Sequence, residues 1–256
     1  REAAIQLNGK SHTIVVQDFN SNGIFNDTWQ RDRNVRTSDG RLYVPRGDTV
    51  YIDPDLKNVN SVGYDLTDHT ARCPVSKIIC IDGDFYDLEI SPSGDTLSLT
   101  RSSAPLGKIE NKNHATQIVL LSDNHGALKL DSREKDAVAV PAGEWSLLEY
   151  MIVPEGARMS NRGPRTFITA AAARDTPTVS VPESETVPYA FGPPYKALVN
   201  TSARGSVDAR LSLKIVGSAE EICTDLSVDG SRPPKPTLSI ATPEGEIVER
   251  GNFEWG

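Results

Sequence analysis

The sequence lacks the features that mark membrane-spanning proteins and most enzymes. Its 256 residues contain no run of eighteen or more apolar residues, so no segment is suited to cross a bilayer as a helix. The patterns H-E-x-x-H, G-x-S-x-G, the phosphate-binding loop and G-x-G-x-x-G are all absent. The four histidines share no metal-ligand spacing. We therefore predict a protein with no membrane span and no catalytic activity.

A hydrolase is the remaining enzymatic alternative. Neighbouring acids such as Glu183 and Glu185 would suit glycosidase chemistry only if the fold held two carboxyls about 5–10 Å apart in a cleft. Acids beside turns are usually surface charge, so we expect no such cleft.

An excess of basic charge is also missing. Lys and Arg number 27 against 35 Asp and Glu, which gives a formal net charge of -8, and the basic residues are scattered among acids. Binding to nucleic acid without regard to its sequence needs clustered Lys and Arg that displace counterions. We therefore exclude nucleic acid as a partner.

Cysteine is scarce, with three positions at Cys73, Cys80 and Cys223. In an exported protein, Cys73 and Cys80 could form a disulfide that closes a short loop leading into a strand. The alternative is that Cys80, within the apolar run Ile78 to Ile81, is a buried small hydrophobe. No histidine accompanies the odd cysteine in a recognisable pattern, so cysteine gives no catalytic signal.

Helical periodicity is missing as well. No stretch of eleven or more residues carries it, and 17 prolines and 19 glycines oppose long helices. Apolar and polar residues instead alternate between turn residues, which indicates half-buried strands and an all-β fold. In the first half, the expected strands are Ile5 to Leu7, Thr13 to Val16, Leu42 to Val44, Thr49 to Ile52 and a hairpin from Phe85 to Thr100.

Length and composition predict two consecutive β domains, 1–107 and 108–256, separated near a Pro-Leu-Gly turn. The second reads as a sandwich in which alternate apolar residues from Val207 to Ile215 would face the core. The proline-rich stretch Thr176 to Pro194 reads as a long connection with edge strands. The other strands expected in this half are Thr116 to Leu121, Ala127 to Leu130, Glu144 to Ile152, Thr166 to Ala172 and a closing hairpin from Thr237 to Trp255.

The most informative stretch is DFNSNGIFND, residues 18–27. Oxygen-bearing side chains occupy positions 1, 3 and 5 of this loop, and the glycine at position 6 permits a sharp turn. The residue at position 7 can offer its backbone carbonyl. Calcium takes six to eight oxygen ligands, which a loop with an oxygen at every second residue can supply. We therefore predict a structural Ca²⁺ bound by Asp18, Asn20, Asn22, Ile24 and Asp27.

The loop differs from an EF-hand, because position 12 is Trp29 and the preceding segment reads as a strand. Its closing acid is Asp27 at position 10. Two Asp and two Asn form a weakly charged cage, which predicts a dissociation constant of roughly 10⁻⁴ to 10⁻³ M. The alternative is that Asn-Ser-Asn-Gly is only a hairpin turn. Asp48, Asp53 and Asp55 could add a ligand from a neighbouring strand, although we expect them to be exposed turn acids.

A second candidate site lies in the proline-stiffened loop Pro188 to Tyr195. Its aromatic rings, at Tyr189, Phe191 and Tyr195, could stack on sugars or anchor a partner. The alternative, which we favour, is that one or two of these rings plug the end of the sandwich.

Several motifs together give the chain a resemblance to other proteins. The D-x-N-x-N-G-x-F-x-D loop is followed by G-D-x-V-x-I-D at Gly47 to Asp53 and by G-x-x-Y-x-L-x-I-S-P-x-G at Gly83 to Gly94. From Ile5 to Leu99 this order resembles a module of uncharacterised bacterial envelope and secreted proteins. The features Pro141 to Trp145 and Gly251 to Gly256 resemble the Ig-like or prealbumin-like sandwiches that accompany it. The resemblance implies calcium and export, and it brings no known activity.

We therefore expect a secreted or periplasmic bacterial protein with a structural or adhesive role and a protein or glycan partner at the cell envelope. The alternative is a carbohydrate-binding accessory module of a secreted system. The chain starts at Arg1 instead of a methionine and looks like a trimmed mature form, so the lack of a visible signal peptide says nothing about destination.

Overall fold

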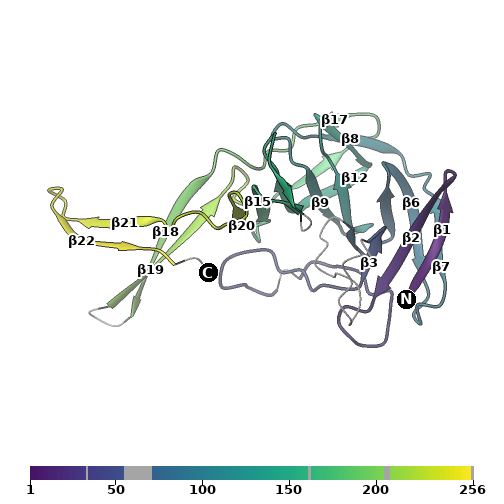
Figure 1. Cartoon of the computed structure of the whole chain (residues 1–256), viewed down its shortest axis with the longest axis horizontal. Coiled ribbons are helices and arrows are strands. Elements are labelled where there is room, and N and C mark those ends of the chain that lie inside the picture. The colour runs from purple at the N-terminus through teal and green to yellow at the C-terminus, as the bar shows by residue number, and fades with distance from the viewer. Residues whose placement is uncertain (33, 55–70, 161–162, 205–207, 255–256) are drawn as a thin grey trace.

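The computed structural model describes residues 1–32, 34–54, 71–160, 163–204 and 208–254 (Figure 1). These residues form strands and turns without a helix, so the all-β prediction is confirmed. Accordingly, the described part of the chain has no helix that could cross a membrane. The strands are β1 (Glu2–Leu7), β2 (Lys10–Gln17), β3 (Thr49–Ile52), β4 (Arg72–Pro74), β5 (Ile78–Ile81), β6 (Asp84–Ile90), β7 (Leu97–Arg101), β8 (Leu106–Glu110), β9 (Gln117–Ser122), β10 (Gly126–Asp131), β11 (Ala137–Pro141), β12 (Gly143–Ile152), β13 (Met159–Ser160), β14 (Gly163–Pro164), β15 (Phe167–Ala171), β16 (Thr178–Val181), β17 (Thr186–Val187), β18 (Lys196–Arg204), β19 (Asp208–Val216), β20 (Ile222–Ser227), β21 (Thr237–Ala241) and β22 (Ile247–Asn252).

Two antiparallel sheets pack together in the N-terminal part, one in the order β1-β2-β3-β4 and the other in the order β5-β6-β7. Successive side chains of a strand point to opposite faces, so Ile14 and Val16 of β2 lie on one face. These side chains share a core cluster with Ile79, Ile81 and Leu88 of the other sheet. The predicted hairpin of the first half is confirmed as β6 and β7.

Strand β5 is buried on both faces. Ile79 and Ile81 belong to the N-terminal cluster, whereas Ile78 belongs to a second cluster and Cys80 packs against it. Cys73 belongs to the N-terminal cluster, so the two cysteines are packed into different cores and no disulfide joins them. The interpretation of Cys80 as a small hydrophobe therefore fits the structure. Burial also raises the pKa of this thiol to about 11, which disfavours a reactive thiolate.

The second cluster is the largest core among the described residues. It lies between an eight-stranded sheet, ordered β10-β9-β12-β15-β20-β19-β18 with β16 paired to β12, and a three-stranded sheet, β11-β8-β17. Leu120 and Trp145 from the large sheet share this core with Ile109 and Val140 from the small sheet. Face-to-face packing of this kind gives a sandwich. The proline-rich connection contains β16 and β17, each of which pairs at a sheet edge.

The outer face of β9 and β10 is covered by the long loop between β2 and β3. Trp29 of this loop is 7% exposed and lies in a third cluster with Val119 and Leu121 of β9. The predicted strand at Leu42 to Val44 is wrong. Leu42 and Val44 pack against the Trp29 cluster, and the neighbouring Arg41 forms a single bridge with Ala173, two residues after the end of β15. Among the described residues, no continuous ladder of hydrogen bonds joins this segment to a sheet. Its apolar residues therefore belong to a loop that covers the sheet.

The C-terminal part forms two hairpins, β18–β19 and β21–β22, that extend away from the layered body (Figure 1). The strands predicted here are confirmed, apart from Val207 and Trp255, which lie outside the described residues. The prediction that one face of β19 lies in the sandwich core is only partly right, because Leu211, Leu213 and Ile215 are half-buried. These residues alternate as predicted, but none of them belongs to a core cluster of the described residues.

The predicted domain boundary after residue 107 stays a prediction. The structure places β8 across that position, and β8 pairs with β11 and β17 of the C-terminal part. Ile78 and Phe85, from the N-terminal part, also belong to the largest core.

Candidate calcium loop and neighbouring polar networks

The Asp18 carboxylate organises the first half of the predicted calcium loop. It accepts hydrogen bonds from the backbone N–H groups of Asn22, at 3.2 Å, and Gly23, at 2.8 Å. The side-chain oxygen of Asn22 then accepts the N–H of Ile24 at 2.8 Å. Gly23 has φ +84°, a backbone conformation that glycine adopts without strain, so the turn expected at position 6 is present.

The predicted ligands converge on Asp27. The side-chain amides of Asn20 and Asn22 donate to Oδ2 of Asp27 at 2.8 Å and 2.7 Å. The structure therefore joins Asn20 and Asn22 directly to Asp27, and it joins Asp18 to this set through the N–H of Asn22. The side chain of Ile24 is 41% exposed, and the role of its backbone carbonyl as a ligand stays a prediction.

Asp48 closes the loop from the next strand, and the expectation that it is an exposed turn acid is wrong. Its side chain is fully buried, and its carboxylate accepts the backbone N–H groups of Phe19, at 3.1 Å, and Asp27, at 2.8 Å. Its own N–H donates to the carbonyl of Asp27 at 2.7 Å. A Cβ atom at Gly47 would collide with that carbonyl, so glycine is required where the two segments meet.

The loop concentrates negative charge. Burial raises the pKa of Asp48, and the neighbouring carboxylates of Asp27 and Asp18 raise it further against the lowering effect of the two backbone hydrogen bonds. No ion pair between a described cation and any of these three acids is present in the described residues. A bound cation would therefore relieve their mutual repulsion.

The donor chemistry of the loop fits calcium, since every predicted side-chain ligand carries oxygen. Within the described residues, no group of three His, Cys, Asp or Glu side chains is arranged to hold a metal ion. The predicted cage depends on asparagine, and here Asn20 and Asn22 direct amide N–H groups toward Asp27. Both amides would have to turn their oxygens inward to serve as ligands. Calcium binding stays a prediction.

Two arginines pack against aromatic rings at the start of the loop. The guanidinium carbons of Arg46 and Arg72 lie 5.8 Å and 5.4 Å from the centre of the Phe19 ring. They lie 5.8 Å and 5.5 Å from the ring of Trp29. Burial, together with the charge of Arg46, lowers the pKa of Arg72. These contacts connect the start of the loop to the tryptophan that covers β9.

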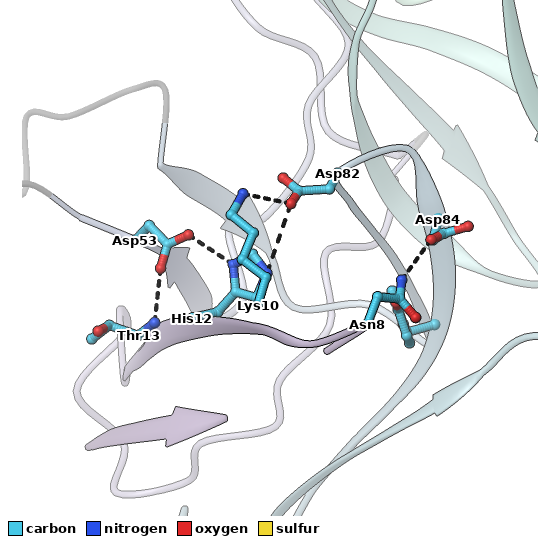
Figure 2. A network of polar contacts seen from close by, with 8 residues as sticks. Asn8, Lys10, His12, Thr13, Asp53, Asp82 and Asp84 are labelled. Carbon is cyan, nitrogen blue, oxygen red and sulfur yellow. Dashed lines mark hydrogen bonds and ion pairs between the residues drawn. The ribbon is translucent and has the colours of Figure 1, made fainter. Parts of the chain in front are cut away.

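A second polar network surrounds His12 at one end of the N-terminal sheets (Figure 2). His12 is 2% exposed, and its Nδ1 lies 2.7 Å from Oδ2 of Asp53, whose other oxygen accepts the N–H of Thr13 at 2.8 Å. Its Nε2 lies 3.8 Å from Asp82, which pairs with Lys10 at 2.6 Å.

Asp53 follows β3, whereas Asp82 lies in the turn between β5 and β6, so this network joins the two sheets. The hydrogen bond between Lys10 and Asp82 raises the pKa of the lysine and lowers that of the acid. Asp53 is therefore engaged with His12 instead of the calcium loop, and Asp55 lies outside the described residues. Sequence analysis missed the buried role of His12. The available signal was its position two residues before Ile14, on the same face of β2.

The three aromatic residues of the proline-stiffened loop lie in or beside the largest core. Tyr189 and Phe191 are 9% and 1% exposed, and Tyr195 is half-buried. The hydroxyl of Tyr189 accepts the backbone N–H of Leu147 at 2.5 Å, and the hydroxyls of Tyr195 and Tyr150 lie 3.2 Å apart. These positions fit the packing alternative. Phe191 presents no face to a ligand, and these rings give the carbohydrate-binding alternative no support.

Glu221 anchors the same loop, and sequence analysis missed it. Its carboxylate is fully buried and accepts hydrogen bonds from the hydroxyl of Tyr150 at 3.0 Å, from Ala219 N–H at 2.8 Å and from Gly192 N–H. A Cβ at Gly217 would collide with this carboxylate. Each partner satisfies a polar group that burial would otherwise leave unpaired, so Glu221 has a packing role.

Comparison of the chain with protein families, with curated proteins and with solved structures found no match. The resemblance to bacterial envelope proteins and the absence of catalytic activity therefore stay predictions.

Proposed function

We propose that this chain is a non-catalytic, calcium-stabilised protein with a structural or adhesive role, secreted or held in a bacterial periplasm. The observation that carries the proposal is the convergence of the Asn20 and Asn22 amides on Asp27, beside a turn held by Asp18 and with the buried carboxylate of Asp48 accepting the N–H of Asp27. Three acids gathered without an ion pair to a described cation suit a divalent ion.

Calcium bound here would stabilise more than its own loop. Asp48 accepts backbone N–H groups from both ends of the loop, and its carbonyl accepts the indole N–H of Trp29 at 3.0 Å. Trp29 in turn covers the outer face of β9. Neutralising the acids would therefore strengthen the attachment of the covering loop to the eight-stranded sheet.

The interaction role is supported by the two C-terminal hairpins. They extend beyond the layered body and carry exposed apolar side chains, among them Val199 at 55% and Val248 at 65%. Exposed apolar groups on projecting strands are typical of surfaces that another chain covers.

Calcium titration by calorimetry, paired with thermal melts in calcium and in EDTA, tests the proposal. We expect one site with a dissociation constant of roughly 10⁻⁴ to 10⁻³ M. Calcium at ten times that constant stabilises the fold by about 1.4 kcal/mol, enough to raise the melting temperature by several degrees. Magnesium at the same concentration serves as the ion control, because it resists the loss of its bound water.

Asp27→Asn removes the charge on which the loop converges and should abolish both the heat and the thermal shift. Asp175→Asn is the matched control, since Asp175 is exposed and lies outside the loop. Equal melting temperatures in calcium and EDTA for the unaltered chain would contradict the proposal.

A further inference from the structure

The two C-terminal hairpins, β18–β19 and β21–β22, carry several exposed apolar side chains. We call β18–β19 the basic arm and β21–β22 the acidic arm, for reasons of charge given below. In Figure 1 both extend to the same side of the molecule, away from β1 to β12. In the basic arm, β18 is the last strand of its sheet, and the acidic arm is an isolated two-stranded sheet.

Both arms carry apolar side chains that are exposed to solvent. In the basic arm, Leu198 and Val199 are 40% and 55% exposed, and as neighbours on one strand they lie on opposite faces. In the acidic arm, Ile247 and Val248 are 46% and 65% exposed, and every residue of β22 is exposed. Neither face of either arm is therefore fully covered within the described chain.

Each arm also has a free backbone edge. The nine residues of β18 pair with β19 on one side, and no described strand pairs with the other side. A long strand edge of this kind is a template for pairing with another strand.

The charges of the arms are opposite. Residues 196–216 contain four basic residues and one acid, a net charge of +3: Lys196, Arg204, Arg210, Lys214 and Asp208. Residues 237–252 contain three acids and one basic residue, a net charge of -2: Glu244, Glu246, Glu249 and Arg250. Complementary charges of this size favour contact between unlike arms and oppose contact between like arms.

We propose that the basic arm of one copy binds the acidic arm of a second copy, so that the chain assembles head to tail. A two-fold pairing of β18 with itself, centred on Asn200, would place Lys196 of one copy opposite Arg204 of the other. The unlike pairing avoids that repulsion and covers the apolar residues of both arms. A contact between two different surfaces repeats along a chain of copies unless the rotation closes a ring. The proposal names the partner within the interaction role above, but it does not depend on calcium.

Sedimentation of the full chain over a concentration series, with and without EDTA, tests the assembly. We expect the average mass to rise at least about twofold with concentration, and the rise to weaken in high salt, which screens charge. This should hold in EDTA too, so a failure of calcium binding leaves this result unaffected. A mass that stays monomeric at every concentration would overturn the proposal.

Charge reversal identifies the surfaces. The double variant Lys196→Glu/Arg210→Glu makes both arms negative, and Glu246→Lys/Glu249→Lys makes both positive. Each variant alone should remain monomeric, and an equal mixture of the two should associate. Arg36→Glu and Glu155→Lys reverse exposed charges elsewhere and should assemble as the unaltered chain does. Melting temperatures confirm that each variant is folded. Association of either double variant alone, at the level of the unaltered chain, would overturn the proposal.

Discussion

Strands β9 and β18 belong to the same eight-stranded sheet, but most side chains of β9 are buried whereas most of those of β18 are exposed. In β9, Leu120 is 1% exposed on the face of the largest core, and Val119 is 2% exposed beneath the loop that carries Trp29. In β18, Leu198 and Val199 are 40% and 55% exposed. Both strands carry apolar residues, so the strand itself does not decide burial. A strand face is buried where a segment distant in sequence covers it, and it is exposed where no such segment does.

The largest effect should come from removing the cover of β9. Trp29→Ala takes away the ring that shields Val119 and Leu121, and we expect a loss of about 3–5 kcal/mol in the free energy of unfolding. Urea denaturation measures the loss. Trp29→Phe, which keeps most of the apolar surface, should recover a large part of it. A loss from Trp29→Ala below about 1 kcal/mol would mean that the loop does not cover β9 in solution.

The comparison itself can be tested by truncating one residue in each strand. Leu120→Ala creates a cavity in a fully packed core and should cost about 2–5 kcal/mol. Val199→Ala removes exposed surface and should stay within about 0.5 kcal/mol for the monomer at low concentration. Equal losses at both positions, measured by chemical denaturation, would break the contrast.

The aromatic loop gives an intermediate effect. Tyr189→Phe leaves the N–H of Leu147 without its acceptor inside the core, which should cost about 1–3 kcal/mol. Tyr195→Phe changes a half-buried hydroxyl and should cost less. Thermal melts of both variants separate packing from recognition: a melting temperature unchanged by Tyr189→Phe would argue against the packing role.

The smallest effect belongs to the exposed part of the His12 network. Lys10→Ala removes an ion pair with Asp82 in which both side chains are more than half exposed, so the denaturation midpoint should not change measurably. His12→Ala removes a buried ring and its contact with Asp53, and the midpoint should fall clearly. If Lys10→Ala destabilised the chain as much as His12→Ala, burial would not be the factor that sets the strength of this network.

The sequence predicted the positions of the strands better than it predicted which strand faces are covered by other segments. Alternation located β6 and β7, because a strand with one buried face leaves a period of two in the residues. The same signal misjudged Leu42 to Val44, where apolar residues pack as a loop. It also placed β19 in a core, since alternation shows that a face is apolar without showing that anything covers it.

For the candidate site, too, the sequence predicted the local contacts but not the contact with a distant residue. Asp18, Asn20, Asn22 and Asp27 are close in sequence, so their spacing predicted that they would lie together, and Asn20 and Asn22 do contact Asp27. The buried state of Asp48 depends on how the strand that follows it meets the start of the loop. That contact joins residues 19 and 48, and no local pattern reports it.

The most direct test of the calcium site is a crystal structure from crystals grown in millimolar calcium, with anomalous scattering to identify the ion. We predict one ion held by oxygens of Asp18, Asn20, Asn22 and Asp27 at about 2.3–2.6 Å, with both asparagine amides turned so that their oxygens face it. Ordered water alone among these four side chains, at a calcium concentration well above the expected dissociation constant, would contradict the account.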